Sequence, residues 1–147
     1  MPGHTHNHLA YLLQLETDAA THVFCGDTLF SAGCGRVFCG TVGDLYRSIS
    51  RFAAMPSNTL FYPAHEYTAS NLRFALSVEA GNQAAQTALQ SAAQTPTLPT
   101  ELAHELAINP FMRLDSKEIV ATLAAQNLPH QHGEAVFASL RQLKNGF

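Results

Sequence analysis

The sequence has little that would suggest a membrane protein, a secreted protein or a nucleic-acid-binding protein. No apolar run reaches the roughly 18 residues that a membrane-spanning helix needs. No basic stretch precedes an apolar core near the N-terminus, so no signal peptide is expected. The net charge of −3 and the pI of about 6.2 leave no basic footprint for nucleic acid. Charged residues make up 13% and apolar residues 46% of the chain, which indicates a globular protein.

Cysteine is also scarce. Cys25, Cys34 and Cys39 make an odd number and form no C-x-x-C pair, so neither a disulfide framework nor a thiolate zinc site is expected. This usage favours a reducing compartment, and we predict a cytoplasmic protein. Two catalytic motifs are missing as well: the G-x-S-x-G elbow of serine hydrolases and the G-x-x-x-x-G-K-[ST] phosphate loop.

Three apolar segments in the first half of the chain predict β-strands. Residues 9–15 are apolar on both alternating faces, which is typical of a strand covered from both sides. The second and third strands are predicted at 21–25 and 59–62, and Asp27 and His65 follow them. We therefore expect both side chains at strand ends, where rigid strands fix the backbone and loops carry the chemistry.

Helical patterns begin after a glycine-rich loop at residues 31–40. Thr41 and Asp44 fit a capping box, and three apolar residues follow at helical spacing, Leu45, Ile49 and Phe52. From residue 68 onward alanine, glutamine and leucine dominate, and helices are the only elements expected. They are predicted at 69–78, 82–93, 100–107, 116–125 and 133–144, with a linker-like break at 94–99.

Four motifs occur in order along the chain: P-G-H-T from Pro2, G-D-T-L-F-S-A-G-C-G-R from Gly26, A-H-E-Y-T-x-S-N-L-R-F-A from Ala64 and N-P-F-M-R from Asn109. This pattern resembles the second half of glyoxalase II, the hydroxyacylglutathione hydrolase family of the metallo-β-lactamase superfamily. The resemblance runs from residue 2 to residue 147. It implies an α/β fold: half of an αββα sandwich in residues 1–70, then an all-helical, glutathione-binding domain in residues 71–147.

The resemblance also implies a metal site. In the family pattern the aspartate of G-D-T-L-F bridges two divalent ions, the histidine of P-G-H-T binds one ion and the histidine of H-E-Y-T binds the other. Carried over, Asp27 is the bridging, catalytic carboxylate, and His4 and His65 are the other ligands. Imidazole and carboxylate suit zinc, with iron or manganese as alternatives.

The family's other metal motif, T-H-x-H-x-D-H, belongs upstream of Pro2 and does not occur in this sequence. One histidine and the shared aspartate remain for each ion, whereas a zinc site uses about three or four protein ligands. We therefore expect a half-site that holds metal weakly or not at all in this chain alone.

The remaining histidines allow a second interpretation. His6 and His8 extend His4 into an H-x-H-x-H run, and in an extended segment all three would point to one side and could bind an adventitious ion. The histidines that match no family motif are expected at the surface, and these are His22, His104, His130 and His132.

A second group of residues corresponds to the family's substrate contacts: Arg36, Phe38, Tyr67, Arg141 and Lys144. Glutathione ends in a carboxylate, which a guanidinium can grip with two hydrogen bonds and which a lysine attracts as a point charge. Arg141 and Lys144 lie one turn apart and so share one helical face. The alternative is that these two cations merely stabilise the C-terminal end of a helix.

The activity that the resemblance implies is hydrolysis of an S-(2-hydroxyacyl)glutathione thioester, such as S-D-lactoylglutathione, to glutathione and D-lactate in methylglyoxal detoxification. Whether this chain is an enzyme by itself is left open, because the site lacks the upstream motif. An apolar strand face left exposed would favour self-association or pairing with a separate N-terminal half. The alternative function is a non-catalytic remnant or a module that binds glutathione or a partner.

Overall fold

The computed structural model describes residues 1–94 and 96–147. Its main sheet has the strand order β1-β2-β5-β6, with β1 (Tyr11–Gln14), β2 (Thr21–Gly26), β5 (Leu60–Pro63) and β6 (Thr100–Glu101). β1 and β2 form an antiparallel hairpin, β2 and β5 run parallel, and β6 is antiparallel to β5. Strands and helices thus mix in one fold, as the sequence predicted.

Helix α1 (Val42–Ala53) connects the parallel strands β2 and β5. It begins with the predicted capping box: Thr41 Oγ1 accepts from the Asp44 N–H at 3.1 Å, and the Asp44 carboxylate accepts from the Thr41 N–H at 3.0 Å. The three apolar residues predicted at helical spacing are all buried. A polar cap and one apolar face therefore fix where this helix starts and how it packs.

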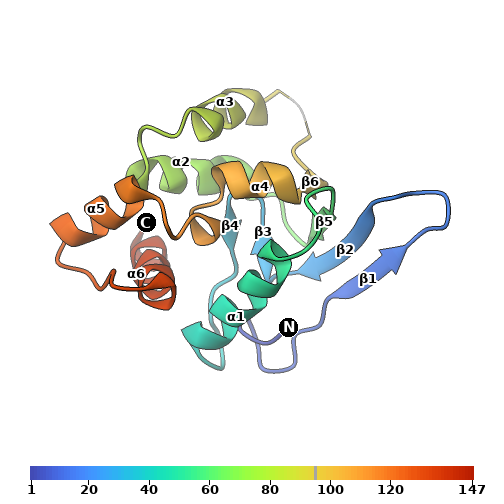
Figure 1. Ribbon diagram of the computed structural model, residues 1–147, viewed down its shortest axis with the longest axis horizontal. Coiled ribbons are helices and arrows are strands. Elements are labelled where there is room, and N and C mark those ends of the chain that lie inside the picture. Colours follow the sequence, from blue (N-terminus) through green and yellow to red (C-terminus); the bar gives the residue numbers. More distant parts are fainter. Residues whose placement is uncertain (95) are drawn as a thin grey trace.

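The rest of the described chain is mainly helical. It contains α2 (Thr68–Val78), α3 (Gln83–Ala92), α4 (Leu102–Ile108), the 3-10 helix η1 (Pro110–Met112), α5 (Lys117–Ala125) and α6 (Gly133–Gly146). Side chains cap four of these helices, since Asn82, Asn109, Ser116 and His132 each accept from a backbone N–H in the first turn. Figure 1 shows these helices gathered on the side away from the β1–β2 hairpin.

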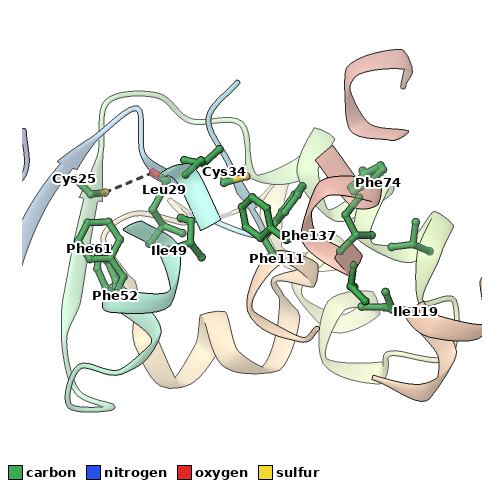
Figure 2. Packing of buried hydrophobic residues seen from close by; sticks show 14 of the residues in the cluster. Cys25, Leu29, Cys34, Ile49, Phe52, Phe61, Phe74, Phe111, Ile119 and Phe137 are labelled. Atoms are coloured by element: carbon green, nitrogen blue, oxygen red, sulfur yellow. Dashed lines mark hydrogen bonds between the residues drawn. The ribbon is translucent and has the colours of Figure 1, made fainter. Parts of the chain in front are cut away.

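One hydrophobic cluster joins the strands to the helices. Phe52 of α1 and Phe61 of β5 pack edge to face with ring centroids 5.1 Å apart. Phe111 of η1 and Phe137 of α6 also pack edge to face, with ring centroids 5.2 Å apart. Figure 2 shows that Phe74 of α2 belongs to the same layer of packed side chains. The predicted division at residue 70 therefore crosses a continuous core, and the two-domain description stays a prediction.

The first strand differs from its prediction. It is shorter than residues 9–15, and its side chains are exposed, with 66% of Tyr11, 61% of Leu12 and 45% of Leu13 accessible. β1 lies at the sheet edge, and Figure 1 shows the hairpin extending away from the helices. The expectation of a strand covered from both sides is wrong for the described chain, because the hairpin extends away from the helices and the side chains of β1 are exposed on both faces.

Short strands account for the other differences. The loop expected at residues 31–40 contains β4 (Gly33–Cys34), which pairs with β3 (Leu29–Phe30). The stretch expected to be only helical after residue 68 contains β6, which adds to β5. Two-residue strands carry no periodic pattern, so a sequence cannot reveal them. The break predicted at 94–99 includes position 95, which is outside the described residues.

None of the helices in residues 1–94 and 96–147 has the length and apolar content that a bilayer crossing needs.

Candidate functional site

The parallel strands β2 and β5 place their carboxyl ends at one edge of the sheet, where Asp27 and His65 follow. The Ala64 N–H donates to the Gly26 carbonyl oxygen at 3.0 Å and joins the two strand ends. Gly26 has φ 54°, and a Cβ there would lie 2.7 Å from Nε2 of His8. Glycine is required at this turn by both conformation and space. The predicted strand-end positions are confirmed.

The Asp27 carboxylate lies between two imidazoles. Oδ1 is 3.4 Å from His65 Nε2, and Oδ2 is 4.0 Å from His4 Nε2. His4 Nδ1 lies 2.9 Å from the carbonyl oxygen of Arg36, and since a carbonyl only accepts, Nδ1 donates. In the neutral ring this bond leaves the lone pair of Nε2 on the side of Asp27. A histidine ligand fixed through its other ring nitrogen is the usual arrangement in metal sites.

The donor set fits part of a metal site. Each carboxylate oxygen of Asp27 faces one imidazole, which is the chemistry expected of a carboxylate shared by two ions. Within the described part of the chain, however, no group of three or more His, Cys, Asp or Glu side chains is arranged to hold a metal ion. The chain brings His4, Asp27 and His65 together, but each of two ions would have only one histidine and the shared carboxylate, fewer than the three or four ligands that a zinc ion normally takes.

His8 positions the backbone of Asp27, a role that the sequence did not suggest. Its Nε2 accepts from the Asp27 N–H at 3.1 Å, so the proton of the neutral ring is on Nδ1, which faces Thr28 Oγ1 at 3.0 Å. Burial lowers the pKa of His8, and the neighbouring His4 lowers it further, against the opposite effect of Asp27. The neutral ring needed to accept this hydrogen bond is thereby favoured.

The H-x-H-x-H run does not share one side. The segment bends and turns before His8, whose N–H donates to the Thr5 carbonyl oxygen. The His6 ring lies beside Gly40, where an added Cβ would be 3.4 Å from His6 Nδ1, whereas the rings of His4 and His8 are 5.7 Å apart and His8 contacts Asp27. The expectation of an extended segment with three aligned histidines is therefore wrong.

His22 is not a surface residue, in contrast to the prediction. Only 12% of its side chain is accessible, since Nδ1 is 3.0 Å from Tyr62 Oη and Nε2 is 2.9 Å from Asp18 Oδ2. His104 and His132 are exposed as expected, and His130 is half-buried. The sequence gives no signal for His22, because its partners come from a turn and from β5.

A pocket of about 810 Å³ opens beside the Asp27 carboxylate. All three candidate metal ligands and all five candidate substrate contacts line it, so the fold brings together every site residue that the sequence suggested. Six further residues line the pocket without having been predicted: Phe30, Cys34, Ser70, Asn71, Arg73 and Phe147. Ser70 and Arg73 follow Tyr67 at intervals of three on α2, which is the signal that could have identified them.

Aromatic rings form the part of the wall nearest the imidazoles. Tyr67 stacks on His65 with centroids 5.1 Å apart and an interplanar angle of 18°, and it meets Phe30 edge on. Phe38, 73% exposed, meets His4 edge on at 5.0 Å. Each imidazole beside Asp27 thus has an aromatic neighbour that also lines the pocket.

Cations line the wall on the side of α6. Lys144 Nζ lies over the rings of Phe74 and Phe147, at 5.1 and 5.3 Å from their centroids. Burial, and then the charges of Arg141 and Arg36, lower the pKa of Lys144 to about 8. The side chain of Arg36 is exposed and has no ion-pair partner in the described chain. Asp27 is the single acidic residue among those that line the pocket.

Arg141 is buried, with 3% of its surface accessible. Its Nη1 donates to the carbonyl oxygens of Cys34 and Gly35, and its Nε donates to Asn145 Oδ1. Nη2 has no hydrogen-bond partner among residues 1–94 and 96–147. Arg141 therefore holds the Gly33–Arg36 backbone and at the same time lines the pocket.

Other buried polar side chains of the helical region hold the same loop. Glu105 accepts from Ser31 Oγ, the Ala32 N–H, Thr100 Oγ1 and Asn109 Nδ2 at 2.7 to 2.9 Å. Asn109 Nδ2 also donates to the Gly33 carbonyl oxygen at 3.0 Å. Burial raises the pKa of Glu105, against the effect of its four donors. The first residue of the N-P-F-M-R motif thus has a structural role at the loop beside the pocket.

This loop packs directly on Asp27. The Gly35 N–H donates to the Thr28 carbonyl oxygen at 3.2 Å, and a Cβ at Gly35 would lie 1.9 Å from the Asp27 carbonyl oxygen. Only glycine can approach the backbone this closely. The position of Asp27 therefore depends on His8 on one side and on the loop at Gly35 on the other.

The C-terminal part of the chain matches a known family. The family model described as hydroxyacylglutathione hydrolase C-terminus covers residues 66–147, which is more than half of the sequence. The chain belongs to the hydroxyacylglutathione hydrolase family. This membership confirms the resemblance inferred from the four motifs.

Curated relatives match over the whole chain. A hydroxyacylglutathione hydrolase of Neisseria meningitidis serogroup A is 56% identical over 149 residues, and that of Neisseria gonorrhoeae strain NCCP11945 is also 56% identical; both alignments cover 99% of this chain and 58% of the relative. That of Shewanella halifaxensis is 47% identical over 153 residues, which cover 100% of this chain and 57% of the relative. The chain thus spans less than two thirds of the length of these hydroxyacylglutathione hydrolases.

Proposed function

We propose that the chain takes part in the metal-dependent hydrolysis of S-(2-hydroxyacyl)glutathione thioesters, with S-D-lactoylglutathione as substrate and glutathione and D-lactate as products. The observation that carries the proposal is the Asp27 carboxylate, placed between the imidazoles of His4 and His65 at a pocket lined with cations. The three free cysteines are consistent with a reducing compartment such as the cytoplasm, where methylglyoxal detoxification would take place.

His4, Asp27 and His65 would hold two divalent ions, with zinc expected and iron or manganese as alternatives. Bound there, the ions would polarise the thioester carbonyl and provide a nucleophile at neutral pH. The protein supplies the orientation: the hydrogen bond from His4 Nδ1 to the Arg36 carbonyl aims Nε2, and His8 holds the Asp27 backbone.

The cationic wall would bind the glutathione part. Lys144 and Arg36 provide charge for the terminal carboxylate, and Tyr67 and Phe38 provide contact surface beside the thioester. Arg141 adds its charge, while its bonds to Cys34 and Gly35 keep it in place. Fixing the tail in this way brings the thioester carbonyl to Asp27 in a defined geometry.

The outer face of the sheet supports a second part of the proposal. Tyr11, Leu13 and Phe24 lie on one face of the hairpin and are 66%, 45% and 45% exposed. We propose that the sheet is one half of an αββα sandwich and that this face packs on a polypeptide equivalent to the part of the relatives that the chain does not span. That polypeptide would supply the remaining metal ligands.

The test is thioesterase turnover of S-D-lactoylglutathione by the chain with Zn²⁺, with and without the separately expressed N-terminal part of the Neisseria meningitidis relative. We expect metal-dependent turnover in the mixture and its loss with Asp27→Ala. His104→Ala, an exposed residue outside the pocket beside Asp27, is the matched control and should keep full turnover. Turnover that persists in the Asp27 variant would contradict the proposal.

A second candidate is a glutathione-binding module without catalysis. The described chain favours it in one respect: the pocket wall is formed within the chain, whereas each ion would have only one histidine and a shared carboxylate. This candidate predicts that S-methylglutathione binds and that no condition in the turnover assay gives hydrolysis. Binding is measured by titration calorimetry on the same preparations.

A further inference from the structure

Arg73 is the one cation of the pocket wall that the proposed function leaves without a role. Its side chain is exposed and lines the pocket from α2. It makes no ion pair or side-chain hydrogen bond within residues 1–94 and 96–147. Two other arginines of the described chain are paired, since Arg47 contacts Asp44 and Arg113 contacts Glu79, whereas Arg36 and Arg51 have no ion pair there. A free guanidinium in a pocket wall is available to an anionic ligand.

The charge balance of the pocket supports this reading. Four cationic residues line it, Arg36, Arg73, Arg141 and Lys144, against the single acid Asp27. Two of these cations already lower the pKa of Lys144, so the wall holds mutually repelling charges that a bound anion would relieve. A glutathione thioester carries two carboxylates and one ammonium, and a single cationic end of the pocket would satisfy only one of those carboxylates.

The position of Arg73 fits the second carboxylate. Tyr67, which stacks on His65, is the residue just before α2, and Arg73 follows it by six residues, a rise of about 9 Å along the helix axis. An extended tripeptide spans at most roughly 10–11 Å, and the thioester sulfur is on its middle residue, so either end of the ligand lies about 5–6 Å from that residue. The long side chain of Arg73, which lines the pocket, covers the remaining distance to a ligand with its thioester beside His65.

We infer that Arg73 is a specificity-determining residue that binds the carboxylate of the γ-glutamyl end of the ligand, while Lys144 binds the carboxylate of the glycine end. Ser70, one turn before Arg73 on the same side of α2, offers a hydroxyl oxygen to the γ-glutamyl ammonium. This inference rests on the proposed glutathione site and adds that the pocket distinguishes the tripeptide from a ligand without its first residue.

The test compares two ligands that cannot be hydrolysed, S-methylglutathione and S-methylcysteinylglycine, by titration calorimetry at low ionic strength. Arg73→Gln should lower the affinity for S-methylglutathione about three- to tenfold. The affinity for the dipeptide should stay unchanged, because only the tripeptide has the γ-glutamyl carboxylate. Lys144→Gln should lower the affinity for both ligands. Arg51→Gln is the matched control, since Arg51 is also exposed and unpaired in the described chain but lies on α1 outside the pocket.

Each outcome decides one point. If the unchanged protein binds S-methylglutathione and Arg73→Gln binds it equally well, the role of Arg73 is wrong and the glutathione site stands. An equal loss for both ligands in Arg73→Gln would show that the ligand lies in the reverse direction and would overturn the inference. If the unchanged protein binds neither ligand, the proposed glutathione site fails and the role of Arg73 fails with it.

Discussion

Arg141 donates a hydrogen bond from Nη1 to the carbonyl oxygen of Cys34 at 3.0 Å, across 107 positions of the sequence. The same nitrogen donates to the Gly35 carbonyl oxygen at 3.2 Å. The last helix is thereby attached to the loop that packs on Asp27. The helical region thus helps to shape the strand-end site as well as the pocket wall.

Replacing this arginine should cost stability. Arg141→Met leaves two buried carbonyl oxygens without their donor, and we expect the free energy of unfolding to fall by about 2–3 kcal/mol. Urea unfolding followed by circular dichroism measures it. Lys144→Met is the control, since Lys144 contacts aromatic rings and should cost about 1 kcal/mol or less. Equal losses in the two variants would contradict the positioning role of Arg141.

A methyl group at Gly35 should disturb the site directly. The added Cβ would lie 1.9 Å from the Asp27 carbonyl oxygen, so either the loop or Asp27 must move. We expect Gly35→Ala to lower the free energy of unfolding by about 1–3 kcal/mol and to weaken Zn²⁺ binding, measured by titration calorimetry on the mixture with the separately expressed N-terminal part of the relative. Gly146→Ala meets nothing within 4 Å and should be neutral or slightly stabilising. Normal stability and metal binding in Gly35→Ala would show that this contact is not needed.

Local patterns predicted much of this site. Asp27 and His65 could be placed at strand ends because an apolar run followed by a polar residue marks the end of a strand. Thr41 and Asp44 predicted the start of α1 because a capping box involves residues only three apart. The family resemblance supplied which of these residues belong together.

Contacts between distant segments could not be predicted in this way. His8 accepts from the backbone of Asp27, and Glu105 binds the loop at Ala32, yet neither contact leaves a periodic or spaced signal. Arg141 was expected either to contact substrate or to stabilise the end of a helix, and its buried bonds to Cys34 depend on how α6 packs. Such partners become known only when the packing of the whole chain is known.

The ion pair between Glu79 and Arg113 should make stability depend on pH. Burial alone would raise the pKa of Glu79, but hydrogen bonds from Arg113, Ser116 and Asn82 outweigh it and hold the pKa below the usual 4.5. The unfolded chain therefore binds the proton more readily than the folded chain. The stabilisation is present above about pH 4.5 and is lost as the pH falls through the lower, folded-state pKa.

Urea unfolding of the unchanged protein and of Glu79→Gln at pH 7 and pH 3 tests this sign. The difference in unfolding free energy between the two proteins should be larger at pH 7, since the carboxylate is then ionised in both states. Asp115→Asn serves as the control, because no ion pair involves Asp115 in the described chain. A difference that grows towards pH 3 would mean that the pKa of Glu79 is raised instead.

Ligand affinity should fall as Lys144 loses its charge. With a pKa of about 8, Lys144 is mostly protonated at pH 7 and mostly neutral at pH 9, and it faces Arg141, Arg36 and the Cys34 thiol. Burial raises the pKa of Cys34 to about 11, so the thiol stays neutral over this range. If the proposed glutathione site is right, S-methylglutathione should bind about three- to fivefold more weakly at pH 9 than at pH 7.

A control is needed to separate the effect of titrating Lys144 from the effect of titrating the ammonium group of the ligand. The Lys144→Arg variant keeps a permanent charge at this position. Its affinity for S-methylglutathione should therefore change with pH only through the titration of the ligand itself. Titration calorimetry at several pH values between 7 and 9 gives both curves. Superimposable curves for Lys144→Arg and the unchanged protein would rule out Lys144 as the titrating group.

The imidazole of His8 fills the volume that a side chain at Gly26 would need. A larger residue at 26 would need this ring to move and would also have to adopt the positive φ of the turn. Moving the ring removes the acceptor for the Asp27 N–H. The turn and the histidine therefore constrain each other, and the carboxylate keeps its orientation only while both are unchanged.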